Sequence, residues 1–223
     1  MKPIRATALV ALMIVPLVAF RFGGWAVITV DTLPTHLVAG TPTSLGFTVR
    51  QHGVRPLSML HPTVVMKSGR AELTVPATPG RLPGQYTATV TPPAAGEWTI
   101  RIISGFMNAE NTLLPLRTVP SGAPAPRVLA DADVGHQLFF AKGCNTCHMR
   151  GDTGGKIGPD LTARRYATAA VATFLGDPES SPLAKTTGFG EIRMPNLNLS
   201  PVEIRALVAY LNSETVVGNV ARR

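Results

Sequence analysis

The residues whose types and spacing could do chemistry form one short run, Cys144-Asn145-Thr146-Cys147-His148. The pattern C-x-x-C-H is the attachment signal of c-type haem. Two thiols three positions apart can reach the two vinyl groups on one edge of a porphyrin, and the next residue offers an imidazole nitrogen to the iron. We therefore predict one haem c, covalently attached through Cys144 and Cys147, with His148 as a ligand of its iron.

The same cysteine pair would also suit two other kinds of site. A structural zinc site would need two further ligands, but the C-terminal half has no other cysteine and only His136 besides His148. A thioredoxin-like dithiol would need a βαβ context, whereas this motif closes a predicted helix in a helical region. Haem attachment is therefore favoured over both.

A second iron ligand can be sought among the methionines near the motif. Met149 directly follows the histidine and cannot reach the opposite face of the haem. Met194 lies in Arg193-Met194-Pro195, where the proline stiffens the loop that would present the sulfur. The alternative role for Met194 is a core residue that fills a gap. Ligation by His148 and Met194 would raise the haem potential, as suits an electron carrier.

The region that positions these residues, 131–213, has the signals of an all-α domain. Asp131 and Asp133 are expected to cap a helix over 134–142. A second helix is predicted from about 168 to 175.

The third helix of this region has the clearest start signal. Ser200 and Glu203 form a capping box, with Pro201 at the first helical position. Residues 214–223 are expected to be a flexible tail. One apolar stripe follows the helix start and comprises Ile204, Leu207, Val208 and Leu211.

Residues 27–119 have a β pattern instead, which predicts a small, all-β antiparallel sandwich. Short alternating apolar runs are separated by turns rich in glycine and proline. Residues 120–130 contain three prolines and are expected to be a stiff, extended linker. The alternating runs are Leu45, Phe47 and Val49; Tyr86, Ala88 and Val90; and Trp98, Ile100 and Ile102.

Further motifs surround the cysteine pair in a set order: Gly135-His136-Gln137-Leu138-Phe139, then Gly158-Pro159-Asp160-Leu161, then Met194-Pro195, then Leu207 and Tyr210. With the C-x-x-C-H run, they make residues 131–213 similar to a class I mono-haem cytochrome c domain. The two-domain fold class is therefore an all-β sandwich followed by an all-α cytochrome c.

That resemblance implies roles for several residues. The carbonyl of Pro159 would accept a hydrogen bond from His148 and fix its orientation. Gly135 would let the last helix cross the first one closely, with Phe139 and Tyr210 packed at the crossing. His136 would be an exposed helix residue.

Several polar residues near the motif have two interpretations. Arg164, Arg165 and Tyr166 would contact the haem propionates, as in the family, or belong to a solvated basic stretch. The lysines that could ring the haem edge and steer an acidic partner are Lys142, Lys156 and Lys185.

The sandwich loosely resembles the immunoglobulin-like YtkA/FixH and CopC-like group, through Gly84-Gln85-Tyr86 and Gly96-Glu97-Trp98. Some members of that group take part in copper handling or oxidase assembly. Thioether and imidazole ligands suit Cu(I), so a copper site is weighed against a plain docking module. Its candidate ligands are His52, Met59, His61 and Met66.

The N-terminal residues 1–26 have the architecture of a signal peptide. Lys2 and Arg5 precede an apolar run over 6–20, which is short for a membrane span. Cleavage after Ala26 is one expectation and an uncleaved membrane anchor the other. Either way, the chain is expected to be exported, to the periplasm or the outer face of the cytoplasmic membrane.

The charge pattern argues against nucleic-acid binding. The formal net charge is +8, but no run of lysine and arginine concentrates it. The expected function is single-electron transfer without catalysis, with a redox protein or the subunits of a respiratory complex as partners. The alternatives are a copper-handling assembly factor, or a haem enzyme or gas sensor if Met194 does not bind iron.

Overall fold

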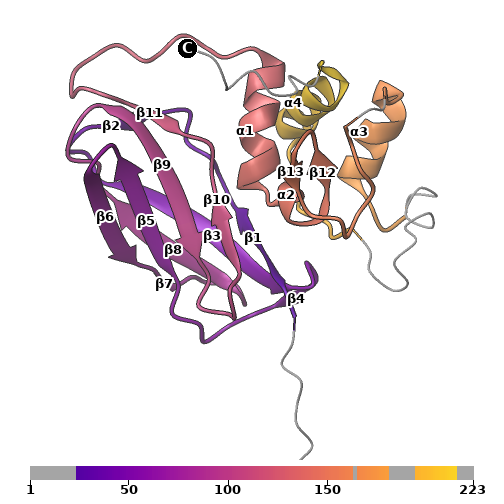
Figure 1. The fold of residues 1–223 in the computed structure, drawn as a ribbon, viewed down its shortest axis with the longest axis horizontal. Coiled ribbons are helices and arrows are strands. Elements are labelled where there is room, and N and C mark those ends of the chain that lie inside the picture. The colour runs from indigo at the N-terminus through magenta and orange to yellow at the C-terminus, as the bar shows by residue number, and fades with distance from the viewer. Residues whose placement is uncertain (1–23, 163–164, 181–193, 215–223) are drawn as a thin grey trace, which may run out of the picture.

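The structure is a computed structural model that describes residues 24–162, 165–180 and 194–214. Figure 1 shows two parts, a block of strands formed by the first half of the chain and a group of helices formed by the second. Residues 1–23 of the predicted leader over 1–26, and residues 215–223 of the predicted tail over 214–223, lie outside the described residues. Among the described residues, no helix has the length and apolar character needed to cross a bilayer.

The strands form two packed sheets, which confirms the predicted sandwich. One has the order β1-β3-β8-β7, with β4 paired to β3, and the other has the order β2-β11-β9-β5-β6, with β10 paired to β9. Every pairing in the sandwich is antiparallel except that of β11 with β2. The strands are β1 (Ala26–Val30), β2 (Leu37–Val38), β3 (Thr43–Gln51), β4 (Arg55–Pro56), β5 (Thr63–Ser68), β6 (Ala71–Pro76), β7 (Thr78–Pro79), β8 (Gln85–Val90), β9 (Gly96–Ile103), β10 (Glu110–Thr112) and β11 (Leu116–Val119).

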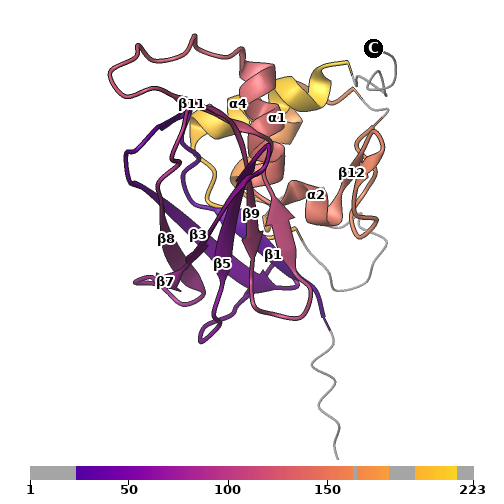
Figure 2. The same cartoon turned by 60° about the vertical axis from the view of Figure 1, so that its left-hand side comes forward.

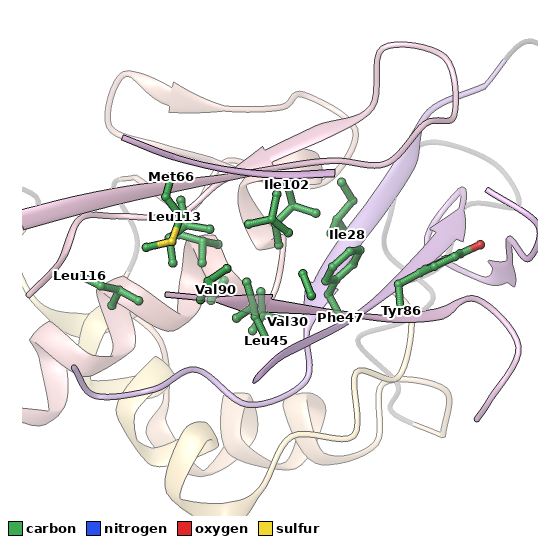
Figure 3. Close-up of a cluster of buried hydrophobic side chains, with 14 of the residues drawn as sticks. Ile28, Val30, Leu45, Phe47, Met66, Tyr86, Val90, Ile102, Leu113 and Leu116 are labelled. Atoms are coloured by element: carbon green, nitrogen blue, oxygen red, sulfur yellow. The ribbon is translucent and has the colours of Figure 1, made fainter. Parts of the chain in front are cut away.

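The core of the sandwich follows from period-two alternation, because alternate side chains of a strand point to the same face. All three runs predicted to alternate are buried in it, one each on β3, β8 and β9. Figure 3 shows Phe47, Tyr86, Met66 and Ile102 among the side chains of this cluster. Tyr86 places its ring in the core and donates its hydroxyl hydrogen to the carbonyl of Leu57 at 2.8 Å.

The second part of the chain contains the predicted helices and a small hairpin near the cysteine motif. The Ser200 capping box is present: the Glu203 amide donates to Oγ of Ser200, and the Ser200 amide donates to the Glu203 carboxylate. The elements are α1 (Asp131–Ala141), α2 (Cys144–Cys147), β12 (Met149–Arg150), β13 (Thr153–Gly154), α3 (Thr168–Gly176) and α4 (Pro201–Asn212).

The start of α1 differs from the prediction. Ala130 occupies the N-cap position without a side-chain hydrogen bond, and Asp131 and Asp133 lie in the first helical turn. Their carboxylates there favour the helix through its dipole rather than by capping an amide.

Helices α1 and α4 cross at Gly135, as the family resemblance implied. A Cβ atom at Gly135 would lie 2.0 Å from the carbonyl oxygen of Ala206 and 2.7 Å from Cβ of Tyr210. The rings of Phe139 and Tyr210 pack beside this crossing, with centroids 5.5 Å apart. Only glycine lets the two backbones approach so closely.

The two parts are packed against each other in both views (Figures 1 and 2). Helix α1 contacts β10 and β1, which Figure 1 shows beside its lower end. Ala141 of α1 is fully buried in the sandwich cluster, and Leu33 packs against the cores of both parts. Asn111 of β10 donates its side-chain amide to the carbonyls of Ile28 at 3.1 Å and Phe140 at 2.9 Å. Apolar and polar contacts therefore both join the domains.

Lys142, at the end of α1, is the central polar residue of this interface. Its side chain is 3% exposed, and Nζ lies 2.8 Å from a Glu203 carboxylate oxygen and donates to the Asp31 carbonyl at 2.8 Å. We call Lys142, Glu203 and Asp31 the Lys142 clamp. The expectation that Lys142 helps to steer an acidic partner is therefore wrong, since its ammonium is consumed by contacts inside the molecule.

Candidate haem site

The cysteine pair is positioned by a sharp turn at the end of α1. Gly143 has φ 74°, in the left-handed region, and the chain then enters the single turn of α2 with Cys144 first and Cys147 last. Both thiols are partly buried and neither is in a disulfide. The two sulfurs therefore come from one helical turn next to the interface with the sandwich.

Burial makes the free thiols weak acids. It raises the pKa of Cys144 to about 12, with a further contribution from Cys147, and it raises the pKa of Cys147 to about 11. A reactive dithiol needs a lowered thiol pKa, so the raised pKa values argue against a redox dithiol. As thiols, Cys144 and Cys147 would hold a haem through thioether bonds.

His148 follows α2 and is fixed by the loop that contains Pro159. Its Nδ1 lies 2.9 Å from the Pro159 carbonyl oxygen. Because a carbonyl can only accept, Nδ1 carries the proton and Nε2 is left with its lone pair for a metal. Burial lowers the pKa of His148 against the opposing effect of Pro159, which favours the neutral imidazole that binds metals.

Gly158 makes room for this imidazole. A Cβ atom at position 158 would lie 2.5 Å from Cε1 and 2.7 Å from Nδ1 of His148. Gly158 therefore leaves room for the imidazole ring, and the Pro159 carbonyl orients it.

A cavity of about 490 Å³ lies beside the C-x-x-C-H motif. Met194 lines this cavity together with Cys144 and His148. This volume is within the range of cofactor and ligand pockets. Helices α1, α3 and α4 supply apolar side chains to its wall. The lining residues are Phe139, Cys144, His148, Pro159, Leu161, Arg165, Tyr166, Val171, Phe174, Leu175, Met194, Leu207 and Leu211.

These residues fit a covalently bound haem. The donor set is two thiols on one helical turn, an oriented imidazole and a thioether, all facing a largely apolar cavity. Within the described residues, no three His, Cys, Asp or Glu side chains are grouped so as to hold a metal ion by themselves. A macrocycle that brings its own iron suits this arrangement better than a bare ion.

Cys147 lines a second, smaller hollow, to which the sandwich contributes Trp25 and Val27. This hollow shares Cys144, His148 and Met194 with the larger cavity. The predicted haem ligands therefore line two neighbouring hollows that have three residues in common.

The candidate copper ligands do not form a site. Met66 is fully buried in the sandwich core, as Figure 3 shows, whereas the Met59 side chain is 91% exposed. The imidazole of His52 packs against Trp25, with ring centroids 5.5 Å apart. These side chains lie in different parts of the sandwich, as their irregular spacing in the sequence would allow, and copper binding is not supported.

The other polar candidates are only partly within the described residues. Arg165 and Tyr166 line the large cavity, and Lys156 is exposed. Arg164 and Lys185 lie outside the described residues.

The expectation for His136 is wrong. Its ring is partly buried and stacks on Tyr210, with centroids 4.8 Å apart. Burial, together with the charge of Arg150, lowers the pKa of His136. The residue belongs to the packing between α1 and α4.

Arg150 is a residue of the site region that sequence reasoning missed. Its guanidinium is buried and donates to the carbonyls of Leu161, Tyr210, Leu211 and Ser213 at distances of 2.7 to 3.2 Å. It also lies 4.4 Å from the ring centroid of Tyr210. Arg150 thus ties the segment after His148 to the end of α4, and its place two residues after His148 was the only signal in the sequence.

The comparisons with known proteins agree with this geometry. The model of the family described as Cytochrome c matches residues 132–215. The C-terminal part of the chain is therefore a cytochrome c domain, as predicted, and such a domain indicates haem binding and electron transfer. No curated protein matches the chain.

Several solved structures show a limited similarity to the chain. The chain is similar to the filamin domain of Lin-41, with 19% identity over 45% of this chain and 86% of that chain, and a TM-score of 0.28. It is also similar to domains 4 and 5 of the S-layer protein SbsC, with 26% identity over 41% of this chain and 50% of that chain, and a TM-score of 0.30. Scores this low support no argument about fold or function.

Proposed function

We propose that this chain is an exported c-type cytochrome that holds one covalent haem and transfers single electrons. The observation that carries the proposal is that Cys144, His148 and Met194 line one largely apolar cavity. The chemistry supplied by the group is an iron that gains and loses one electron at a time.

Each residue has a distinct role in this proposal. Cys144 and Cys147 would hold the haem through thioethers, and His148 would offer Nε2 to its iron while Pro159 holds the imidazole ring. Met194 would offer its sulfur to the same iron. A carrier would keep both ligands bound, since a fixed ligand set keeps the rearrangement on electron transfer small.

The apolar wall completes this function. Phe139, Leu207 and Leu211 face the cavity and exclude water from it. A low-dielectric surrounding with few mobile dipoles limits reorganisation and influences the potential of the site.

The location and partners follow from the leader and the chemistry. A basic start followed by an apolar run over 6–20 supports export, with the cytochrome in the periplasm or held at the outer face of the cytoplasmic membrane. The partner would be a redox protein or a subunit of a respiratory complex. The sandwich would then belong to an electron-transfer unit, whether the chain works alone or within a complex.

A redox titration with a carbon monoxide assay tests this proposal. The purified, haem-loaded chain should titrate as a single one-electron couple, and the ferrous form should not bind carbon monoxide. Met194→Ala should bind carbon monoxide rapidly, because the iron would then lack its methionine ligand. Rapid carbon monoxide binding by the unaltered protein would overturn the carrier and favour a haem enzyme or gas sensor.

A further inference from the structure

The wall of the haem site nearest Cys147 is built partly by the other domain. Trp25 and Val27, at the start of the sandwich, face the same hollow as Cys144, Cys147 and His148. Val27 is on β1 and Trp25 directly precedes it. A domain that looks separate in the sequence thus contributes side chains to the cofactor region.

The two domains also meet closely at two glycines near this wall. A Cβ atom at Gly143 would lie 2.8 Å from both the Ile28 carbonyl oxygen and a Val27 methyl carbon. A Cβ atom at Gly53 of the sandwich would lie 3.1 Å from Cγ of Pro195, the residue after Met194. The sandwich therefore abuts the segment before the first cysteine and the segment that carries the methionine.

Trp25 is held in place by its neighbours in the sandwich. Its ring packs at a tilt against His52, and its carbonyl accepts the His52 amide at 3.0 Å. Pairing of β1 with β3 continues this contact from Ala26 opposite Gln51. The indole is therefore part of an ordered strand pair.

The Lys142 clamp fixes the position of this wall relative to the cysteines. Lys142 lies two residues before Cys144 and binds the Asp31 carbonyl just after β1. Thr29 of β1 donates its hydroxyl to the Lys142 carbonyl at 3.4 Å. Any movement of β1 away from the haem site would have to break these buried contacts.

We infer that Trp25 and Val27 are part of the haem-binding site, where they shield the bound group from water on the side of the sandwich. This inference rests on the proposed function, because it assumes a covalent haem at Cys144 and Cys147. Solvent exposure lowers a haem potential, since water stabilises the more highly charged oxidised state. The sandwich therefore raises the potential and limits the access of small polar reductants.

The test uses the full exported chain, produced with haem attached, and compares variants at the wall with one elsewhere. The variants are Trp25→Ala, Trp25→Phe and Val27→Ala, and the control is Leu82→Ala, at an exposed position away from the site. The readouts are the midpoint potential and the rate of reduction by ascorbate. Trp25→Ala should lower the potential and speed reduction several-fold, Trp25→Phe should restore most of both values, and Leu82→Ala should change neither.

Three outcomes would overturn the inference. One is a covalent haem whose potential and reduction rate in Trp25→Ala and Val27→Ala equal those of Leu82→Ala, which leaves the proposed function standing. A second is a mature chain that starts at Val27 by intact mass, because it would lack Trp25. The third is a chain without covalent haem, which ends the proposed function as well. If Trp25→Ala accumulates poorly, Val27→Ala alone decides between the first outcome and the expected one.

Discussion

His148 shows how much of the site depends on residues that bind nothing themselves. Its Nδ1 is engaged by the Pro159 carbonyl, and its ring occupies the space that a side chain at Gly158 would fill. Partners of this kind set the tautomer and orientation of a metal-binding histidine, and their loss commonly weakens a metal site by about 10- to 100-fold. The orientation of the His148 imidazole is thus set by the Pro159 carbonyl and by the absence of a side chain at Gly158.

Gly158→Ala tests this residue-scale argument. The new methyl group would meet the His148 ring at 2.5 Å and displace it, so iron ligation should weaken. We expect the haem to stay attached to the cysteines, while the ferrous protein gains carbon monoxide binding and the potential falls.

The matched control for this variant is Pro159→Ala. It keeps the carbonyl that accepts from His148, so the ligand should stay oriented and the ferrous protein should not bind carbon monoxide. Equal behaviour of Gly158→Ala and Pro159→Ala would contradict the role given to the empty space.

At the scale of elements, the α1–α4 crossing holds one side of the cavity. Phe139 and Leu207 reach the haem region from these two helices, and Gly135 sets how closely the helices approach. Arg150 ties the segment after His148 to the same pair of helices. Its guanidinium donates to several backbone carbonyls at once, which no other side chain could do in the same place. The rigidity of the haem site therefore depends on the rigidity of the α1–α4 crossing.

Gly135→Ala should separate the two helices. The added Cβ would lie 2.0 Å from the Ala206 carbonyl oxygen, which belongs to the backbone and cannot rotate away. We expect the free energy of unfolding to fall by about 3 kcal/mol, the upper end of the usual cost of overpacking. Urea denaturation followed by haem absorbance measures it, and Gln137→Ala on the same helix should cost under about 0.5 kcal/mol.

Arg150→Met should leave the carbonyls at the end of α4 without their buried donor. Removal of one partner from a buried, charged hydrogen-bond set costs about 2 to 3 kcal/mol, and the same denaturation experiment should show that loss. The control is Arg205→Met, whose ion pair with Asp131 is exposed and contributes under about 1 kcal/mol. A larger effect at Arg205 than at Arg150 would refute this account of the helix end.

At the scale of the whole molecule, the two domains behave as one unit around the haem site. The Lys142 clamp and the Asn111 contacts join them through buried polar groups, and Ala141 joins them through apolar packing. A linker alone would leave the sandwich free to move, whereas these contacts place β1 against the cysteine motif.

Acid should loosen this unit through Glu203. Burial acts to raise the pKa of Glu203, but contacts with Lys142 and Ser200 outweigh it and hold the pKa below its ordinary value of 4.5. The ion pair therefore stabilises the fold fully above about pH 4.5, and this stabilisation is lost as the pH falls through the lowered pKa.

Stability measured across the acidic range tests the clamp. Glu203→Gln should remove the part of the acid-dependent loss that comes from this carboxyl. Lys142→Met should lower the free energy of unfolding by about 3 kcal/mol at neutral pH, as expected for one broken buried pair. The control is Glu110→Gln, since its pair with Arg101 is exposed on both sides and should give no comparable change.

The parts of the molecule that could be predicted are those with local signals. The C-x-x-C-H spacing, the Ser200 capping box and the alternation on β3, β8 and β9 each contain their own physical reason. The burial of Lys142 and the position of Trp25 could not be read in this way, because both depend on contacts between distant segments. Trp25 even stood beside an apparent leader cleavage point, whereas β1 begins at Ala26 and the indole packs on His52.

Near-infrared absorption of the ferric protein tests the central claim most directly. A weak methionine-to-iron charge-transfer band should be present in the haem-loaded chain and absent from Met194→Ala, with the haem still covalently attached in both. A chain whose covalent haem shows no such band, or a Met194→Ala variant that keeps it, would contradict ligation by Met194 and with it the electron carrier described above.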